Sequence, residues 1–233
     1  MKVAIVGGGA AGMVTAHYLN KKHDVTVFEK QSMLGGNIRT LNKNVREGVD
    51  KVPSDIFIDN GVIEFDASNF HQFHALMREL GVDMQSVSLT TGYFAENGHH
   101  YLSPYRIFHT ESNWIERLRA SLRLGFCAAD FVSFMTRTAG RNATDYKDHA
   151  VSEYFRDHVY YRWLKMLLMY AYSIPYAQVD DMPAQLGIPV LRRSALFTRW
   201  TRIPNGVYSY IEKILDRFNC TVRTGAVIEG IAR

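Results

Sequence analysis

Residues 2–30 read KVAIVGGGAAGMVTAHYLNKKHDVTVFEK, and this stretch decides the fold. Residues 2–6 form a short β-branched apolar run, which predicts a buried strand. Residues 13–20 carry apolar side chains at helical spacing, and residues 23–29 return to the pattern of a strand. The stretch therefore predicts a β-α-β unit whose two strands are parallel neighbours.

The first turn of this unit holds Gly7-x-Gly9-x-x-Gly12, with Ala10 and Ala11 between the last two glycines. In such a turn the first glycine permits a tight bend and the second lets a phosphate approach the backbone. The third glycine lets the helix pack close to the strand. The free N–H groups and the positive dipole at the helix start suit a pyrophosphate. We therefore predict a dinucleotide site here, against the alternative of a purely structural glycine turn.

Glu29 ends the second strand and is followed by Lys30. A carboxylate at this position can accept hydrogen bonds from a ribose diol, and it would repel a 2′-phosphate. The sequence therefore disfavours NADP and places Glu29 and Lys30 in the candidate cofactor site.

A second glycine-rich segment follows, Gly35-Gly36-Asn37-Ile38-Arg39-Thr40. Its glycines can bring backbone close to a ligand, and Arg39 can meet a phosphate, although the residues alone also fit a flexible loop. The segment resembles the one that follows the ribose acid in the flavin-containing amine oxidase superfamily. That superfamily includes monoamine and polyamine oxidases, protoporphyrinogen oxidases and phytoene desaturases. Gly35, Gly36, Arg39 and Thr40 match the pattern, whereas Asn37 replaces the usual arginine.

The resemblance implies FAD as the cofactor and adds further residues to the site. Asp59 and Gly61 match an Asp-x-Gly segment that approaches the cofactor in the family, although Asp59-Asn60-Gly61 also fits an ordinary turn. Val227 matches a valine whose backbone meets the adenine. Members of the family normally continue for about as many residues again, so the resemblance implies a complete adenine end and an incomplete flavin end. No catalytic residue is assigned, and no metal site is expected.

We expect an α/β fold, namely a Rossmann-like FAD-binding domain with a mainly helical α+β insertion. Residues 1–66 and 200–233 form the discontinuous FAD/dinucleotide-binding domain, and residues 67–199 form the substrate or helical insertion domain. The insertion should contain a hairpin with strands at 87–94 and 99–102. Four longer helices are expected, at 68–80, 113–138, 150–172 and 207–218. The first has Ser68 as its N-cap, and the second is interrupted at Gly125. A short helix is expected between Pro183 and Pro189, and strands are expected at 220–223 and 227–231.

The helix at 113–138 has an apolar stripe and a basic side. The stripe consists of Ile115, Leu118, Leu122 and Phe126, and the basic side of Arg117, Arg119 and Arg123. Two interpretations stay open for the basic side, a solvated helix face or a peripheral membrane contact. The aromatic side chains of 150–172 likewise suit either a substrate pocket or a helical core.

Composition limits the function classes. A net charge of +4 in 233 residues is mild and indicates no nucleic-acid partner. Cys127 and Cys220 are too few for a disulfide framework and favour a reducing compartment. The first strand begins at Lys2 and no long apolar run follows, so we expect a cytoplasmic protein without signal peptide or transmembrane helix. His71 and His74 lack a third ligand at a defined spacing, so a metal site is disfavoured.

The leading hypothesis is an FAD-dependent oxidoreductase, or a fragment of one, that transfers hydride from a C–N or C–C bond of a small substrate to flavin. The alternatives are an NAD-dependent oxidoreductase, which the Gly-Gly-x-x-Arg-Thr segment disfavours, and a non-catalytic binding module left by truncation. An open sheet edge near residues 220–231 would favour self-association, or a partner that supplies the missing flavin-side segment.

Overall fold

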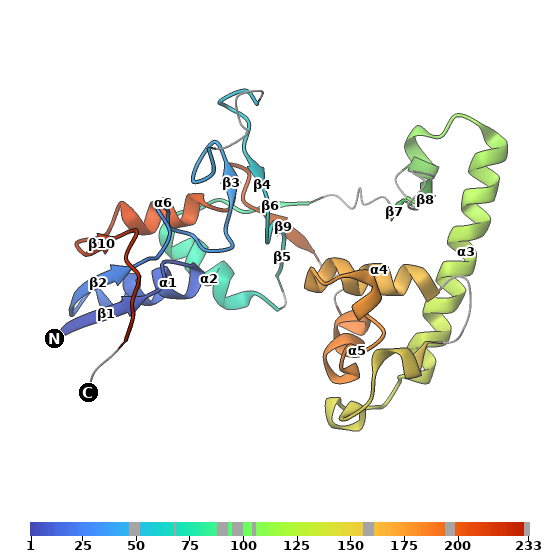
Figure 1. Cartoon of the computed structure of the whole chain (residues 1–233). Helices are drawn as coiled ribbons and strands as arrows, with labels where there is room; N and C mark the ends of the chain where they lie inside the picture. The colour runs from blue at the N-terminus through green and yellow to red at the C-terminus, as the bar shows by residue number, and fades with distance from the viewer. Residues whose placement is uncertain are drawn as a thin grey trace. The chain divides into compact units, whose positions relative to one another are not determined.

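The computed structural model describes residues 1–46, 52–67, 69–87, 93–94, 100–103, 106–155, 161–193 and 199–230. The chain divides into two compact units (Figure 1). Met1–Val87 and Arg199–Arg233 form the nucleotide unit, and Ser88–Thr198 forms the helical unit. The boundary expected at residue 66 lies at residue 87 instead. The reason is that α2 (His71–Leu80) buries Leu76, Met77 and Leu80 in the core of the nucleotide unit.

The nucleotide unit is built on the expected β-α-β arrangement. β1 (Lys2–Val6), α1 (Ala10–Leu19) and β2 (Asp24–Phe28) follow one another, and β1 pairs with β2 in parallel from Lys2–Asp24 to Val6–Phe28. β10 (Thr221–Arg223) pairs in parallel with the other side of β2, which gives the order β1-β2-β10. The prediction of neighbouring parallel strands is confirmed.

Two expectations about strands differ from the structure. β1 was expected to be buried, but it buries Ile5 and exposes Ala4 and Val6, because among the described residues only β2 pairs with it. Residues 227–230 were expected to form a strand, but they pair with no strand in the described part of the chain. β10 is consequently one edge of this sheet as described, and β1 is the other.

Short antiparallel pairs complete the nucleotide unit. β3 (Thr40–Leu41) pairs with β4 (Ile58–Asp59), and β9 (Trp200–Arg202) pairs with both β5 (Phe65–Asp66) and β6 (Gln85–Ser86). The β9 pairings join the two segments of the unit directly. One core cluster combines side chains of the sheet with Met13 of α1, Met77 of α2 and Ile211 of α6 (Ser209–Leu215).

The helical unit has its own core. α3 (Trp114–Arg137), α4 (Arg162–Tyr172) and α5 (Ala184–Arg193) contribute to it, for example through Phe134, Leu168 and Ile188. β7 (Tyr93–Phe94) and β8 (His100–Leu102) pair antiparallel, as the predicted hairpin requires, and its turn lies outside the described residues.

Helix boundaries in this unit differ from the sequence in three places. α3 runs unbroken through Gly125, so the predicted interruption is wrong, because one glycine costs a helix interior only about 1 kcal/mol. The helix expected from residue 150 begins at Arg162, after a 3₁₀ turn at Val151–Tyr154. Pro189 lies inside α5 rather than at its end. Ser68, the predicted N-cap, lies outside the described residues, and α2 begins at His71.

None of the helices in the described part of the chain is both long enough and apolar enough to span a bilayer.

Candidate dinucleotide site

The three glycines of the first turn solve three different steric problems. Gly7 has φ +101°, which L side chains rarely adopt. A Cβ on Gly12 would lie 1.9 Å from the carbonyl oxygen of Gly7, so any side chain there would collide with the turn. A Cβ on Gly9 would meet nothing closer than the Cα of Gly36, at 3.8 Å. Gly9 therefore leaves open space at the helix start, where the sequence predicts a phosphate.

The N-terminus of α1 is available for an anion. Gly9 is its N-cap and provides no side-chain hydrogen bond, and Ala10 and Ala11 are exposed. The first N–H groups of a helix have no partner within the helix, and they carry the positive end of its dipole. This is the geometry that binds a pyrophosphate in dinucleotide-binding folds.

Gly35 and Gly36 pack against the first turn, backbone to backbone. The Gly35 N–H donates to the Gly8 carbonyl at 2.8 Å, and Gly9 and Gly35 form a parallel bridge. Both glycines have positive φ, +113° and +59°, and a Cβ on Gly36 would lie 3.0 Å from the Cα of Gly9. The structure thus brings together two glycine segments that are separate in the sequence, and the packing explains why both are glycine.

Glu29 is buried beside these segments, with 7% of its side chain exposed. One carboxylate oxygen accepts the Gly8 N–H at 2.6 Å, and the other accepts the Gln31 N–H at 2.9 Å. The hydrogen bond from Gln31, followed by that from Gly8, lowers the pKa of Glu29 despite its burial, so the carboxylate is ionised at neutral pH. Glu29 therefore holds the glycine turn in place, a role that the sequence analysis missed. Its predicted ribose contact stays a prediction.

The basic candidates lie at the margin of the site. The Arg39 guanidinium donates to the Gln31 side chain at 2.5 Å and to the Met33 sulfur at 2.6 Å, both within its own loop. Lys30 and Asn37 are exposed. The phosphate contact expected of Arg39 and the cofactor contacts expected of Lys30 and Asn37 stay predictions.

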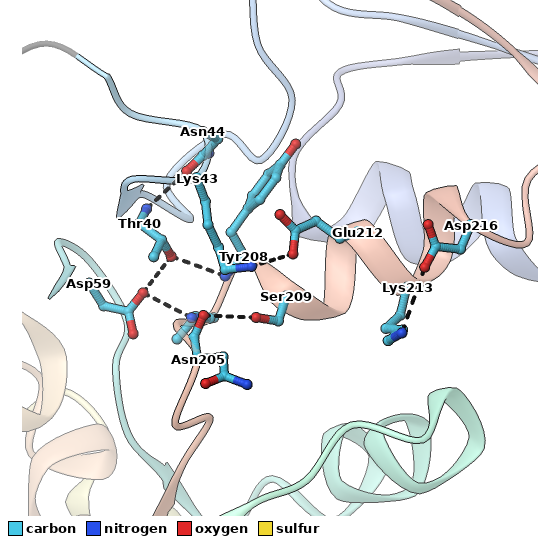
Figure 2. A network of polar contacts seen from close by, with 11 residues as sticks. Thr40, Lys43, Asn44, Asp59, Asn205, Tyr208, Ser209, Glu212, Lys213 and Asp216 are labelled. Carbon is cyan, nitrogen blue, oxygen red and sulfur yellow. Dashed lines mark hydrogen bonds and ion pairs between the residues drawn. The ribbon is translucent and has the colours of Figure 1, made fainter. Parts of the chain in front are cut away.

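Thr40 and Asp59 form a polar network that reaches α6 (Figure 2). The Thr40 hydroxyl donates to Asp59 Oδ1 at 2.5 Å. The same hydroxyl accepts the Tyr208 N–H at 3.1 Å, and Asp59 Oδ1 accepts the Val207 N–H at 2.9 Å. Val207 and Tyr208 lie at the start of α6, so the two polar side chains satisfy backbone donors that the helix itself leaves unpaired. The network ties three distant segments together.

Two further glycines fit around this network. A Cβ on Gly206, which has φ +83°, would lie 2.3 Å from Thr40 Cγ2. A Cβ on Gly61 would lie 2.4 Å from the carbonyl oxygen of Asn37. Asp59 and Gly61 thus contact the Gly35–Thr40 segment, although the sequence assigned them to the cofactor. Gly206 ends the Pro204-Asn205-Gly206 segment that precedes α6.

Val227 follows a residue that is hydrogen-bonded just beyond the end of β2. The preceding residue, Ala226, donates its N–H to the Glu29 carbonyl at 2.9 Å, and Val227 itself is 74% exposed. The backbone of residues 226–227 therefore follows the edge of the candidate site, and the adenine contact stays a prediction.

The helical unit contains a separate pocket of about 460 Å³. Its lining includes Met135, Arg141, Tyr146, Pro189, Arg192 and Arg193. Arginine side chains suit carboxylate and phosphate groups. The Arg192 guanidinium donates to the Thr138 carbonyl, which also accepts the Tyr146 hydroxyl at 3.1 Å, so two parts of this lining have structural roles. Trp163, one of the aromatic residues for which a substrate pocket and a helical core both stayed open, is buried and packs against Phe131 in the core.

Reactive groups are scarce in the described residues. They contain no cluster of histidine, cysteine or acidic side chains that could hold a metal ion. Burial raises the pKa of the Cys127 thiol to about 11, so this thiol is not a nucleophile at neutral pH.

A parallel β-α-β unit, an uncapped helix start and an ionised acid at the end of the second strand are the features of a Rossmann-type fold. In agreement, residues 5–80 match the family model of the NAD(P)-binding Rossmann-like domain. The 2-dehydropantoate 2-reductase of Bacillus subtilis (strain 168) is 25% identical over 114 residues, which cover 47% of this chain and 37% of the reductase.

Solved structures share the fold over nearly the whole chain. An oxidoreductase from Methanosarcina mazei aligns over 97% of this chain, with 15% identity and a TM-score of 0.53. A putrescine oxidase aligns over 97% of this chain, with 15% identity and a TM-score of 0.61. A protein from Exiguobacterium sp. 255-15, described as a protoporphyrinogen oxidase, aligns over 100% of this chain, with 15% identity and a TM-score of 0.56. The likeness to these structures confirms the expected fold. The chain spans 51%, 51% and 54% of these structures, respectively.

Proposed function

We propose that the nucleotide unit binds FAD and belongs to a flavin-dependent oxidoreductase of the amine oxidase type. One observation carries the proposal. The Gly35–Gly36 backbone packs against the Gly7–Gly12 turn, beside an uncapped helix start and a buried, ionised carboxylate. An NAD enzyme needs the turn and the acid, but it has no need of the second glycine segment.

The residues present suit FAD at its adenine and pyrophosphate end. The N–H groups at the start of α1 would hold the pyrophosphate, and the second lone pairs of the Glu29 oxygens would accept the ribose hydroxyls. Six further residues are proposed to contact the phosphates or the adenine of FAD. They are Lys30, Gly35, Gly36, Asn37, Arg39 and Val227. Thr40, Asp59 and Gly61 are assigned to holding this site in shape, from the contacts that they make.

When bound, FAD would supply a hydride acceptor for a C–N or C–C bond of a small substrate. The described residues of this chain bind and orient the nucleotide, and none is assigned to catalysis. Because the chain spans about half of the matched structures, we propose that the flavin-side and substrate-side groups come from a further segment or from a partner polypeptide. Self-association through the β10 edge stays a prediction.

A second candidate is binding of NAD. It is favoured by the name of the matched domain family and by the similarity to a 2-dehydropantoate 2-reductase. The ionised Glu29 opposes the 2′-phosphate of NADP, so NAD would be the preferred nicotinamide nucleotide.

Titration of the purified chain with FAD, NAD and NADP tests the proposal. We expect FAD to bind most tightly and to confer the flavin absorption band. Glu29→Gln should weaken FAD binding about 10- to 100-fold, because it removes a charged acceptor worth about 1.5–3 kcal/mol.

Glu116→Gln is the matched control, because Glu116 lies on α3 in the other unit. Unchanged FAD affinity in Glu29→Gln, or tighter binding of NADP than of FAD, would contradict the assignment. The melting temperature of Glu29→Gln must be measured as well, because this side chain also holds Gly8.

A further inference from the structure

The pocket of the helical unit is lined by charge of one sign. Its charged lining residues are Arg141, from the loop after α3, and Arg192 and Arg193, from the last turn of α5. No acidic side chain of the described residues lines it. Asp145, close to Arg141 in the chain, accepts the Asn142 backbone N–H at 2.7 Å instead. A concave site with positive charge alone attracts and concentrates anions.

Arg192 is held in position by the protein itself. Its guanidinium donates to the Thr138 carbonyl, which also accepts the Tyr146 hydroxyl at 3.1 Å. This carbonyl lies at the end of α3, where a helix leaves its own acceptors unpaired. Thr138 and Tyr146 are both buried, so water does not compete for this anchor. The contact uses one of the five N–H donors of the guanidinium, and the other donors are available to a ligand.

Arg141 is oriented by an aromatic ring. Its guanidinium carbon lies over the Tyr154 ring, 5.6 Å from the centroid, and Tyr154 packs edge to face against Tyr146 at 5.3 Å. A guanidinium that stacks on a ring keeps its N–H donors for another partner. Within the described part of the chain, no carboxylate pairs with Arg141 or Arg192. Both arginines are therefore positioned without being neutralised.

The number and origin of the arginines favour a phosphate group over a carboxylate. One guanidinium fork is enough to bind both oxygens of a carboxylate. A phosphate monoester has three terminal oxygens and nearly two negative charges at neutral pH, so it can engage several guanidinium groups at once. Three arginines from two segments of the chain match the monoester better.

The same pocket has room and apolar surface for an organic group. Met135 of α3 and Pro189 of α5 belong to its lining, and both are half-buried. The volume of about 460 Å³ lies within the range of about 300–1,000 Å³ that is typical of sites for small organic ligands. An inorganic ion would leave much of this space and the apolar wall unused.

We propose that this pocket binds a small organic phosphate monoester. Arg141, Arg192 and Arg193 hold the phosphate group, and Met135 and Pro189 contact the organic part. The site lies within the helical unit, so it is distinct from the candidate dinucleotide site, and its occupancy does not depend on FAD.

Calorimetric titration of the full chain with phenyl phosphate tests this site. Phenyl phosphate should bind saturably and about tenfold or more tightly than either inorganic phosphate or benzoate. Inorganic phosphate lacks the organic group, and benzoate lacks the phosphate. Binding should weaken as salt is raised, because the arginine contribution is screened.

Substitutions locate the bound phosphate. The double variant Arg141→Gln/Arg193→Gln should bind phenyl phosphate about tenfold or more weakly, because it removes two charged donors. Both side chains are exposed, so the circular dichroism and the melting temperature should stay unchanged. The matched control is Arg119→Gln on α3, since Arg119 is 70% exposed and lies outside the pocket lining.

Three results would overturn the proposal. The first is the absence of saturable binding of phenyl phosphate. The second is equal affinity in the double variant and in Arg119→Gln, which would place the bound phosphate elsewhere, for example at the start of α1. The third is binding of benzoate or inorganic phosphate as tight as that of phenyl phosphate, which would contradict the class of ligand.

Discussion

Gly9 and Gly12 belong to one motif, yet the space around them differs, so their substitution should have different effects. Gly12→Ala should destabilise the nucleotide unit by about 1–3 kcal/mol or more, because its Cβ would lie 1.9 Å from the Gly7 carbonyl oxygen. Gly9→Ala should leave stability nearly unchanged, because its backbone has φ −76° and nothing crowds the Cβ. It should nevertheless lower dinucleotide affinity, because the methyl group fills the space expected for a phosphate.

Urea unfolding and nucleotide titration of both variants measure these effects. Each variant is the control of the other, since both add one methyl group to the same turn. Equal loss of stability in the two variants would contradict the steric difference between the two positions. Unchanged nucleotide affinity in Gly9→Ala would show that the open space at Gly9 does not serve a ligand.

Asp59 was predicted to approach the cofactor, and the structure gives it a bridging role as well. Asp59→Ala should lower the free energy of unfolding by about 1–3 kcal/mol, because it removes an acceptor from the Thr40 hydroxyl and from the Val207 N–H. Asp59→Asn, which keeps an oxygen acceptor, should cost less. Asp216→Ala is a suitable control, since the Asp216 side chain is 66% exposed and its carboxylate pairs only at 3.7 Å with the Lys213 ammonium group. Chemical denaturation measures the free energy of unfolding of both variants. An equal loss in Asp59→Ala and Asp216→Ala would contradict this role.

At the scale of elements, Glu79 connects α2 to α1. Its carboxylate accepts hydrogen bonds from Lys21 at 3.0 Å, His17 at 3.1 Å and Tyr18 at 3.1 Å, all on α1 or just after it. The pKa of Glu79 is lowered from 4.5 to about 2, mainly by the hydrogen bond from Lys21 and next by that from His17. Because the pKa is lowered by folding, this stabilisation is complete above pH 4.5 and is lost as the pH falls toward 2.

Glu79→Gln should therefore flatten part of the pH dependence of unfolding between pH 4.5 and 2. The effect should stay below about 1 kcal/mol at neutral pH, because the carboxylate is 36% exposed and water screens the charges. Thermal melts of both proteins across this pH range measure it. Parallel curves for the wild type and Glu79→Gln would show that the contact between α1 and α2 does not depend on this charge.

At the scale of the whole molecule, the two units have separate hydrophobic cores. The helical unit is one continuous segment, Ser88–Thr198, whereas the nucleotide unit needs both segments of the chain. We therefore expect a fragment of residues 88–198 to fold alone, with helical circular dichroism and a cooperative thermal transition. A fragment of residues 1–87 should not fold alone, because β9, α6 and β10 all come from the second segment. A non-cooperative melt of the 88–198 fragment would show that its core depends on the rest of the protein.

Local patterns in the sequence predicted the β-α-β unit and the end of α2 at residue 80. They succeeded because a strand, a glycine turn and an amphipathic helix each depend on residues that are near neighbours in the chain. The same reasoning predicted a helix over residues 113–138, close to the observed bounds of α3, but it misplaced the start of α4, since a 3₁₀ turn and an α-helix share similar side-chain patterns.

The sequence by itself therefore determined the Rossmann-type fold of this unit, through the spacing of Gly7, Gly9, Gly12 and Glu29. Only the tertiary structure decided what Glu29, Thr40 and Asp59 contact, because their partners are backbone N–H groups of Gly8, Val207 and Tyr208. It also decided that the apolar stripe of α3 faces away from the core. A helix with apolar side chains on two sides does not reveal which side is buried, since that depends on which face its neighbours cover.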